Sequence, residues 1–149
     1  MRIARLVVAN FMLITAGAAV AQTAGAPTFR IGDVDGANAT FVFDGNARPP
    51  VIILRTARAG VAGSRIEVTV DQAKEPVFRH IFAPGECKFG EGAEGGSACE
   101  VTISEKGAAY RAILTRFKRG HLARVTVQDA GVMKMDQTAS LKGFAKLLH

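Results

Sequence analysis

The sequence predicts an all-β domain, an antiparallel β-sandwich or partly open barrel, with one amphipathic helix and a short C-terminal helix. About seven or eight short apolar or alternating segments follow one another, separated by turn residues, which is typical of such sheets. One segment near residue 110 has helical periodicity instead. The chain has 149 residues, of which 48% are hydrophobic and 21% charged, so a disordered or fibrous class is excluded.

The first 21 residues have the pattern of a secretory signal peptide. Arg2 and Arg5 give a positively charged start, an apolar run follows over residues 6–20, and the run ends at Ala21 among small residues that signal peptidase accepts. The apolar run has about 15 residues, fewer than the roughly 20 that a membrane-spanning helix needs. We therefore predict a signal peptide over 1–21 and a single β-rich domain over 22–149, exported and without a transmembrane segment.

Each expected strand is an alternating segment or a short apolar run between turns. Residues 65–70 alternate so that three apolar side chains share one face. Residues 51–54 are continuously apolar, which suits a strand buried on both faces. In chain order, the expected strands are 28–34, 40–44, 51–54, 65–70, 77–82, 99–103, 122–128 and 132–135. The last two form a predicted hairpin around a turn over residues 129–131.

Two helices are expected after the Gly-rich loop, which lies between Cys87 and Cys99. The first is predicted to be capped by Ser104 and to stop at Gly120. Its apolar residues recur at helical spacing and form one stripe: Tyr110, Ile113, Leu114 and Phe117. A shorter helix is expected to begin near Ser140, with Gly143 in its interior at a place of close packing.

Cys87 and Cys99 are the two cysteines of the chain. In an oxidising compartment they are expected to form one disulfide, which closes a ring of about 13 residues and is worth roughly 3 kcal/mol in the chain-entropy model. A catalytic thiol is the alternative, but no Cys-x-x-Cys pattern is present. The G-x-G-x-x-G pattern at residues 90–95 lies between these cysteines and contains two glutamates, so we do not interpret it as a phosphate-binding loop.

The order of segments in the second half of the chain suggests a family. Gly-Ser-Arg-Ile-Glu-Val at 63–68 leads to the cysteine pair, a helix ends in Phe-Lys-Arg-Gly at 117–120, and the chain closes with Ser-Leu-Lys-Gly-Phe at 140–144. Over roughly residues 63–147 this resembles the invasion-associated locus B proteins, exported envelope proteins of alphaproteobacteria. The first half departs from the family pattern, because it lacks an early Trp and a further Cys. The resemblance implies an envelope location and a link to host-cell invasion, and it carries over no catalytic residue.

No pattern of catalytic residues or metal ligands is found in the sequence. His80, His121 and His149 show no ligand spacing, and no Gly-x-Ser-x-Gly elbow marks a serine nucleophile. Asp33 and Asp35 alternate as a glycosidase pair could, but they lie between glycines and are interpreted as turn residues. We therefore predict no cofactor and no metal, and a non-enzymatic binding module. The alternative is a small periplasmic enzyme or enzyme inhibitor whose site the sequence does not mark.

Positive charge is concentrated around the predicted helix. Six basic residues and no acidic one lie between positions 106 and 124. The candidate contacts for an anionic partner are Arg111, Arg116, Lys118, Arg119 and Arg124. Such a face suits an anionic lipid, lipopolysaccharide or an acidic envelope or host protein, and the expected location is the periplasm, the periphery of the outer membrane or the outside of the cell after secretion. The alternative is a merely solvated surface. Nucleic acid is not expected, because the protein is exported and its basic residues lack interleaved aromatics.

Overall fold

The computed structural model describes residues 28–32, 39–47, 49–56, 61–90 and 97–148. The predicted signal peptide lies outside these residues, as do Asp33, Asp35 and His149 and most of the G-x-G-x-x-G segment. Within the described residues, no helix is long and apolar enough to cross a membrane.

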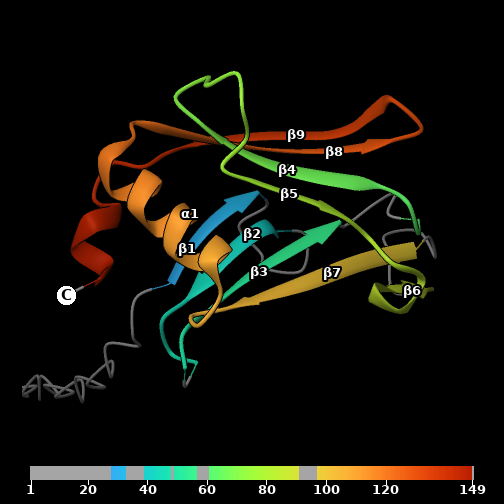
Figure 1. Ribbon diagram of the computed structural model, residues 1–149, viewed down its shortest axis with the longest axis horizontal. Coiled ribbons are helices and arrows are strands. Elements are labelled where there is room, and N and C mark those ends of the chain that lie inside the picture. Colours follow the sequence, from blue (N-terminus) through green and yellow to red (C-terminus); the bar gives the residue numbers. More distant parts are fainter. Residues whose placement is uncertain (1–27, 33–38, 48, 57–60, 91–96, 149) are drawn as a thin grey trace, which may run out of the picture.

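The fold consists of two antiparallel sheets that face each other, which confirms the predicted sandwich-like all-β class (Figure 1). The first sheet has the strand order β1-β2-β3-β7-β6, and the second has the order β5-β4-β8-β9. The strands of the first sheet are β1 (Thr28–Gly32), β2 (Ala39–Asp44), β3 (Val51–Thr56), β6 (Cys87–Phe89) and β7 (Ser97–Ser104). Those of the second are β4 (Arg65–Val70), β5 (Phe78–Ile81), β8 (Leu122–Asp129) and β9 (Val132–Ser140).

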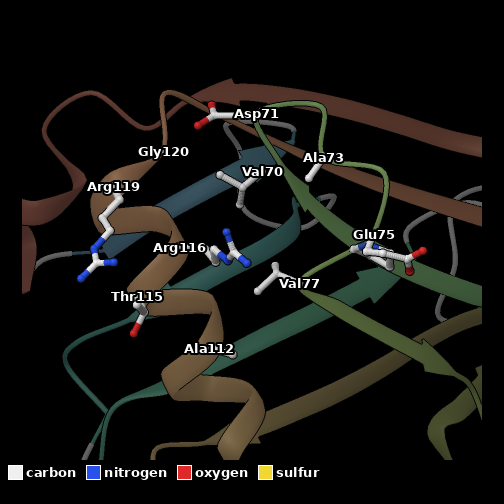
Figure 2. A pocket seen from close by; sticks show the side chains of 11 residues that line it. Val70, Asp71, Ala73, Glu75, Val77, Ala112, Thr115, Arg116, Arg119 and Gly120 are labelled. Carbon is white, nitrogen blue, oxygen red and sulfur yellow. The ribbon is translucent and has the colours of Figure 1, made fainter.

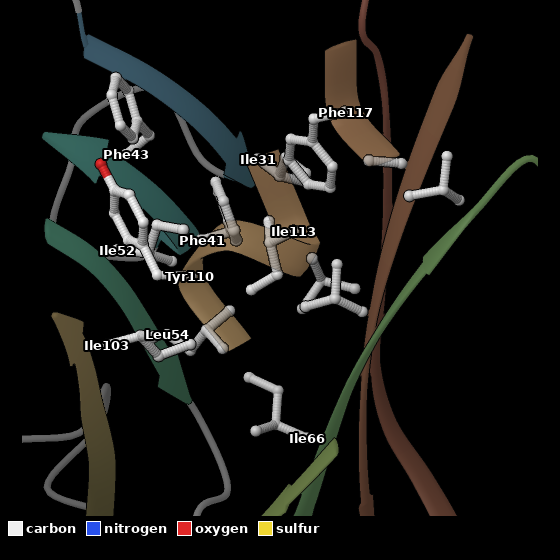
Figure 3. Packing of buried hydrophobic residues seen from close by; sticks show 14 of the residues in the cluster. Ile31, Phe41, Phe43, Ile52, Leu54, Ile66, Ile103, Tyr110, Ile113 and Phe117 are labelled. Carbon is white, nitrogen blue, oxygen red and sulfur yellow. The ribbon is translucent and has the colours of Figure 1, made fainter. Parts of the chain in front are cut away.

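The core lies between the inner faces of the two sheets (Figure 3). The predicted alternation of β4 is confirmed, because Ile66, Val68 and Val70 are all buried. The chain has no Trp, and phenylalanine rings fill the end of the core near the helix. The rings of Phe117 and Phe144 have their centroids 5.2 Å apart, packed edge to face. Aromatic contacts therefore join the helix to the closing segment of the chain.

The predicted amphipathic helix is α1 (Ala108–Arg119), which lies against one end of the sandwich (Figure 1). Three residues of its apolar stripe, Tyr110, Ile113 and Phe117, are buried. The predicted cap is wrong: Ser104 is the last residue of β7, where it pairs with Val51, and the N-cap residue is Gly107. The strand continues further than expected because its pairing with β3 persists to that residue.

The predicted C-terminal helix begins later than expected and is a 3₁₀ helix, η3 (Phe144–Leu148). Ser140 belongs to β9 instead, because β8 continues to pair with it through Leu122. The expected close packing at Gly143 is also wrong, since a Cβ added there would meet no atom within 4 Å. Its φ of +85° explains the glycine, because this left-handed conformation is costly for other residues.

Two short elements were not predicted, the 3₁₀ turn η1 (Pro84–Glu86) and the three-residue strand β6. Together they carry the chain from the second sheet at β5 back to the first sheet. Glu86 fixes this corner, since its Oε2 accepts hydrogen bonds from the backbone N–H of Ala83 at 2.8 Å and lies 2.8 Å from Nε2 of His80. These hydrogen bonds, chiefly the one from His80, lower the pKa of Glu86.

Candidate functional site

The predicted disulfide between Cys87 and Cys99 is present. The two residues face each other directly in the pairing of β6 with β7. Cys99 is fully buried, and its backbone N–H donates to Oγ1 of Thr56 at 2.8 Å. The bridge therefore attaches the edge strand β6 covalently to the interior of the first sheet.

Four of the five predicted cationic contacts lie on α1, and all four are exposed: Arg111, Arg116, Lys118 and Arg119. We call these four residues the cationic face. Arg111 and Lys118 are seven residues apart and therefore lie on the same side of the helix. Arg116 points to a neighbouring side, toward the segment that connects β4 with β5, whereas Figure 2 shows the Arg119 side chain directed away from that segment.

Arg124, the fifth candidate, does not belong to this face. It lies on β8, where its Nε and Nη2 donate to the two carboxylate oxygens of Asp136 at 2.8 and 2.6 Å. This bidentate pair lowers the pKa of Asp136. The charge of Arg124 is therefore matched within the sheet, and the structure separates it from the helix residues.

Other strand arginines are matched in the same way. Arg55 of β3 pairs with Glu100 of β7 at 2.6 Å, and Arg79 of β5 pairs with Glu67 of β4 at 2.5 Å. In contrast, within the described part of the chain no carboxylate lies within 4 Å of a basic group of the cationic face. The four basic residues of the cationic face thus lie on one short helix without a carboxylate partner among the described residues.

A cleft of about 930 Å³ separates α1 from the β4–β5 connection (Figure 2). One wall of the cleft is formed by residues of α1 that recur at helical spacing: Ala112, Thr115, Arg116 and Arg119. The opposite wall and the floor come from residues 70–77. Figure 2 shows the Arg116 side chain extending from the helix toward this second wall.

The second wall is fixed by Asp71. Its Oδ1 accepts hydrogen bonds from the backbone N–H groups of Leu122 at 2.9 Å and His121 at 2.8 Å. These two bonds, the one from Leu122 first, lower the pKa of the Asp71 carboxyl group, so it is ionised at neutral pH. Asp71 adopts a φ of 52°, a left-handed turn conformation that aspartate tolerates better than most residues.

Asp71 and Glu75, the two carboxylates of the cleft, were not predicted as site residues from the sequence. Their only sequence signal is their position in a short polar connection between two predicted strands. Both residues line the same cleft as Arg116, which is more than 40 residues further along the chain, a proximity that depends on the tertiary fold. Figure 2 shows the Glu75 carboxylate directed away from α1.

The described residues include no group of three or more His, Cys, Asp or Glu side chains that could hold a metal ion. The fold and its surface define a small disulfide-bonded β-sandwich with a cationic helix at one end. Comparison of the chain with protein-family models, curated proteins and solved structures found no match.

Proposed function

We propose that this protein is an exported, non-enzymatic binding protein of the bacterial cell envelope that attaches to anionic groups through the cationic face of α1. The observation that carries the proposal is the contrast between matched and unmatched charges. Arg55, Arg79 and Arg124 each have a carboxylate partner on a neighbouring strand, whereas the four basic residues of α1 have none among the described residues. Unmatched cations on one face produce a field that attracts anionic surfaces.

The compartment is supported by two features. A disulfide persists in an oxidising environment outside the cytoplasm. The first 21 residues have the pattern of a signal peptide. The resemblance to the invasion-associated locus B proteins adds an envelope location and a role in host-cell contact to the proposal.

The partner favoured by this geometry is a membrane surface rich in anionic headgroups or lipopolysaccharide phosphates. A Lys or Arg near such a surface contributes about 1 kcal/mol, so four of them give roughly 4 kcal/mol at low salt. That corresponds to a dissociation constant of about 1 mM, which describes reversible attachment. Salt weakens it, because the Debye length is about 10 Å at 0.1 M salt.

The test is co-sedimentation with phosphatidylglycerol–phosphatidylcholine vesicles at low and high salt. Arg111→Glu/Lys118→Glu is expected to abolish binding at low salt, and high salt is expected to release the unmodified protein. The control is Lys88→Glu/Lys134→Glu, which makes the same charge change on β6 and near the start of β9. Figure 1 shows β6 and the β8–β9 turn at the end of the molecule remote from α1. Binding that persists in the helix variant, or that is lost equally in the control, would rule out the cationic face as the docking site.

The same variants apply to native envelopes. A graded salt wash is expected to release the unmodified protein, and osmotic shock at low salt is expected to release Arg111→Glu/Lys118→Glu. Free release of the unmodified protein at low salt contradicts peripheral attachment. In that case, co-purification with an acidic protein partner is the next measurement.

A further inference from the structure

We infer that the outer face of the second sheet binds a neutral oligosaccharide. A groove of about 620 Å³ lies on this face. Strands β4, β8 and β9 supply its floor, and residues 71–74, which follow β4, supply one wall. We call it the outer groove. No described lining residue of this groove belongs to α1, so the inference goes beyond docking through the cationic face.

The first step is the chemistry of the floor. The inner residues of β4 and β8 are buried in the core, so the residues between them lie on the outer face. Residues that pair directly across neighbouring strands share a face. Two such rows cross β4, β8 and β9 in the groove: Thr69–Arg124–Thr138 and Glu67–Thr126–Asp136. The floor thus presents hydroxyl, guanidinium and carboxylate groups side by side, which all hydrogen-bond to the hydroxyl groups of a sugar.

The second step is that these groups keep hydrogen-bonding capacity. In the described part of the chain, the hydroxyl groups of Thr69 and Thr138 have no hydrogen-bond partner. Arg124 donates to Asp136 through Nε and Nη2, which leaves its Nη1 group for a ligand. Each carboxylate oxygen of Asp136 has a further lone pair. Because the ion pair already holds both side chains in place, binding a ligand would order little more.

The third step is the balance of charge. The groove is lined by three carboxylates and two basic side chains: Glu67, Asp71, Asp136, Lys74 and Arg124. Asp136 matches Arg124, and Glu67 is matched by Arg79 of β5 at 2.5 Å. In contrast to the cationic face, the outer groove has no excess of positive charge that would attract a phosphate or a carboxylate. A ligand that is neutral and rich in hydroxyl groups fits this balance.

The fourth step concerns length. Leu122 and Met133 line the groove and are 42% and 44% exposed. Met133 pairs with Gln128, so the two apolar side chains are about six residues of β8 apart, or about 20 Å. Sugar rings combine hydroxyl groups with apolar C–H surface, which gains from contact with such side chains. A polar floor with an apolar side chain toward each end favours several linked rings over a single sugar.

The test is a titration of the isotopically labelled protein with cellotetraose, maltotetraose and N-acetylchitotetraose, followed by NMR chemical shifts. We expect at least one of these neutral tetrasaccharides to give saturable shifts confined to residues 67–74 and 122–138. Tetragalacturonic acid carries a carboxylate on each ring. It is expected to bind at least about tenfold more weakly, because three carboxylates line the groove.

Matched variants complete the test. Thr69→Val/Thr138→Val removes two hydroxyl groups and is expected to weaken binding about tenfold or more, whereas Thr69→Ser/Thr138→Ser keeps both hydroxyl groups and is expected to bind. Thr102→Val is the control, because Thr102 is an exposed threonine on β7 of the other sheet. Thermal unfolding of each variant shows that it is folded.

Absence of saturable shifts with all three neutral tetrasaccharides would overturn the inference, as would undiminished binding by Thr69→Val/Thr138→Val. Tighter binding of tetragalacturonic acid would overturn the neutral ligand. Attachment through α1 is tested separately, because neither threonine belongs to the cationic face and Thr69→Val/Thr138→Val is expected to bind anionic vesicles normally. A protein that binds vesicles but no tetrasaccharide refutes the outer-groove inference alone.

Discussion

Gly120 is the residue that decides how closely α1 approaches the second sheet. Its backbone lies so near β4 that an added Cβ would be 2.3 Å from Val70 and 3.1 Å from Leu141. The sequence predicted a glycine stop for the helix, and that position is confirmed. The φ of Gly120 is −84°, so the reason for glycine here is space and not a left-handed backbone.

We therefore expect Gly120→Ala to destabilise the protein by about 1–3 kcal/mol, the usual cost of forcing a methyl group into a packed contact. Gly85→Ala is the matched control, because a Cβ at Gly85 meets no atom within 4 Å. The measurement is urea unfolding of both variants. Equal midpoints for the two would contradict the close approach.

Asp71 is the second residue on which the cleft depends, and it makes stability depend on pH. The pKa of its carboxyl group is lowered in the folded protein by the N–H groups of Leu122 and His121. The ionised Asp71 carboxyl group therefore stabilises the folded protein at pH values above its ordinary pKa of 3.8. This contribution is lost as the pH falls through the lower pKa of the folded protein. Asp71→Asn is expected to be less stable than the unmodified protein at pH 7, with the difference vanishing below both pKa values.

The measurement is the free energy of unfolding from pH 7 to pH 2. Asp136 and Glu86 also have lowered pKa values, so both proteins are expected to lose stability in acid. A difference between Asp71→Asn and the unmodified protein that stays constant across this range would show that the charge of Asp71 has no part in fixing the turn.

At the scale of elements, the strands with clear alternation were predictable and the short ones were not. Strand β4 has its predicted bounds, because alternate burial of its residues follows directly from the period of a strand. Strand β6 has three residues, too few for any period to be visible. The end of β9 was predicted as helix because Leu141, Phe144 and Leu147 have helical spacing. Its pairing with β8, which sequence periodicity does not report, extends the strand to Ser140.

At the same scale, the disulfide holds strand β6 against β7. Replacing both cysteines, Cys87→Ala/Cys99→Ala, is expected to cost about 3 kcal/mol. Because β6 is an edge strand, hydrogen exchange is expected to rise first at Lys88 and Phe89, while amides of β4 and β8 stay protected. Two reactive thiols in the purified, denatured protein would contradict the bridge. Uniform loss of protection would show that the bridge supports the whole sandwich instead.

On the scale of the whole molecule, the ion pairs that arginines form among the described residues lie on the strands and not on α1. Arginines paired with carboxylates lie on the strands, whereas the cationic face, which has no carboxylate within 4 Å among the described residues, lies on the helix. The sequence showed the basic run near the helix but not which of its members is neutralised, because Asp136 meets Arg124 only across the β8–β9 pairing. For the same reason, no local pattern marks the cleft, whose walls come from residues 70–77 and 112–120.

The order of the strands in the two sheets also determines when the protein can fold. The first sheet takes strands from before residue 57 and after residue 86, and the second takes strands from 65–81 and 122–140. Val51 of β3 pairs with Ser104 of β7, and Arg65 of β4 pairs with Gln128 of β8, so neither pairing can form before the later strand has been made. Contacts between such distant residues form slowly. Neither sheet is therefore complete early along the chain, so a chain that emerges residue by residue stays open until β8 and β9 have followed.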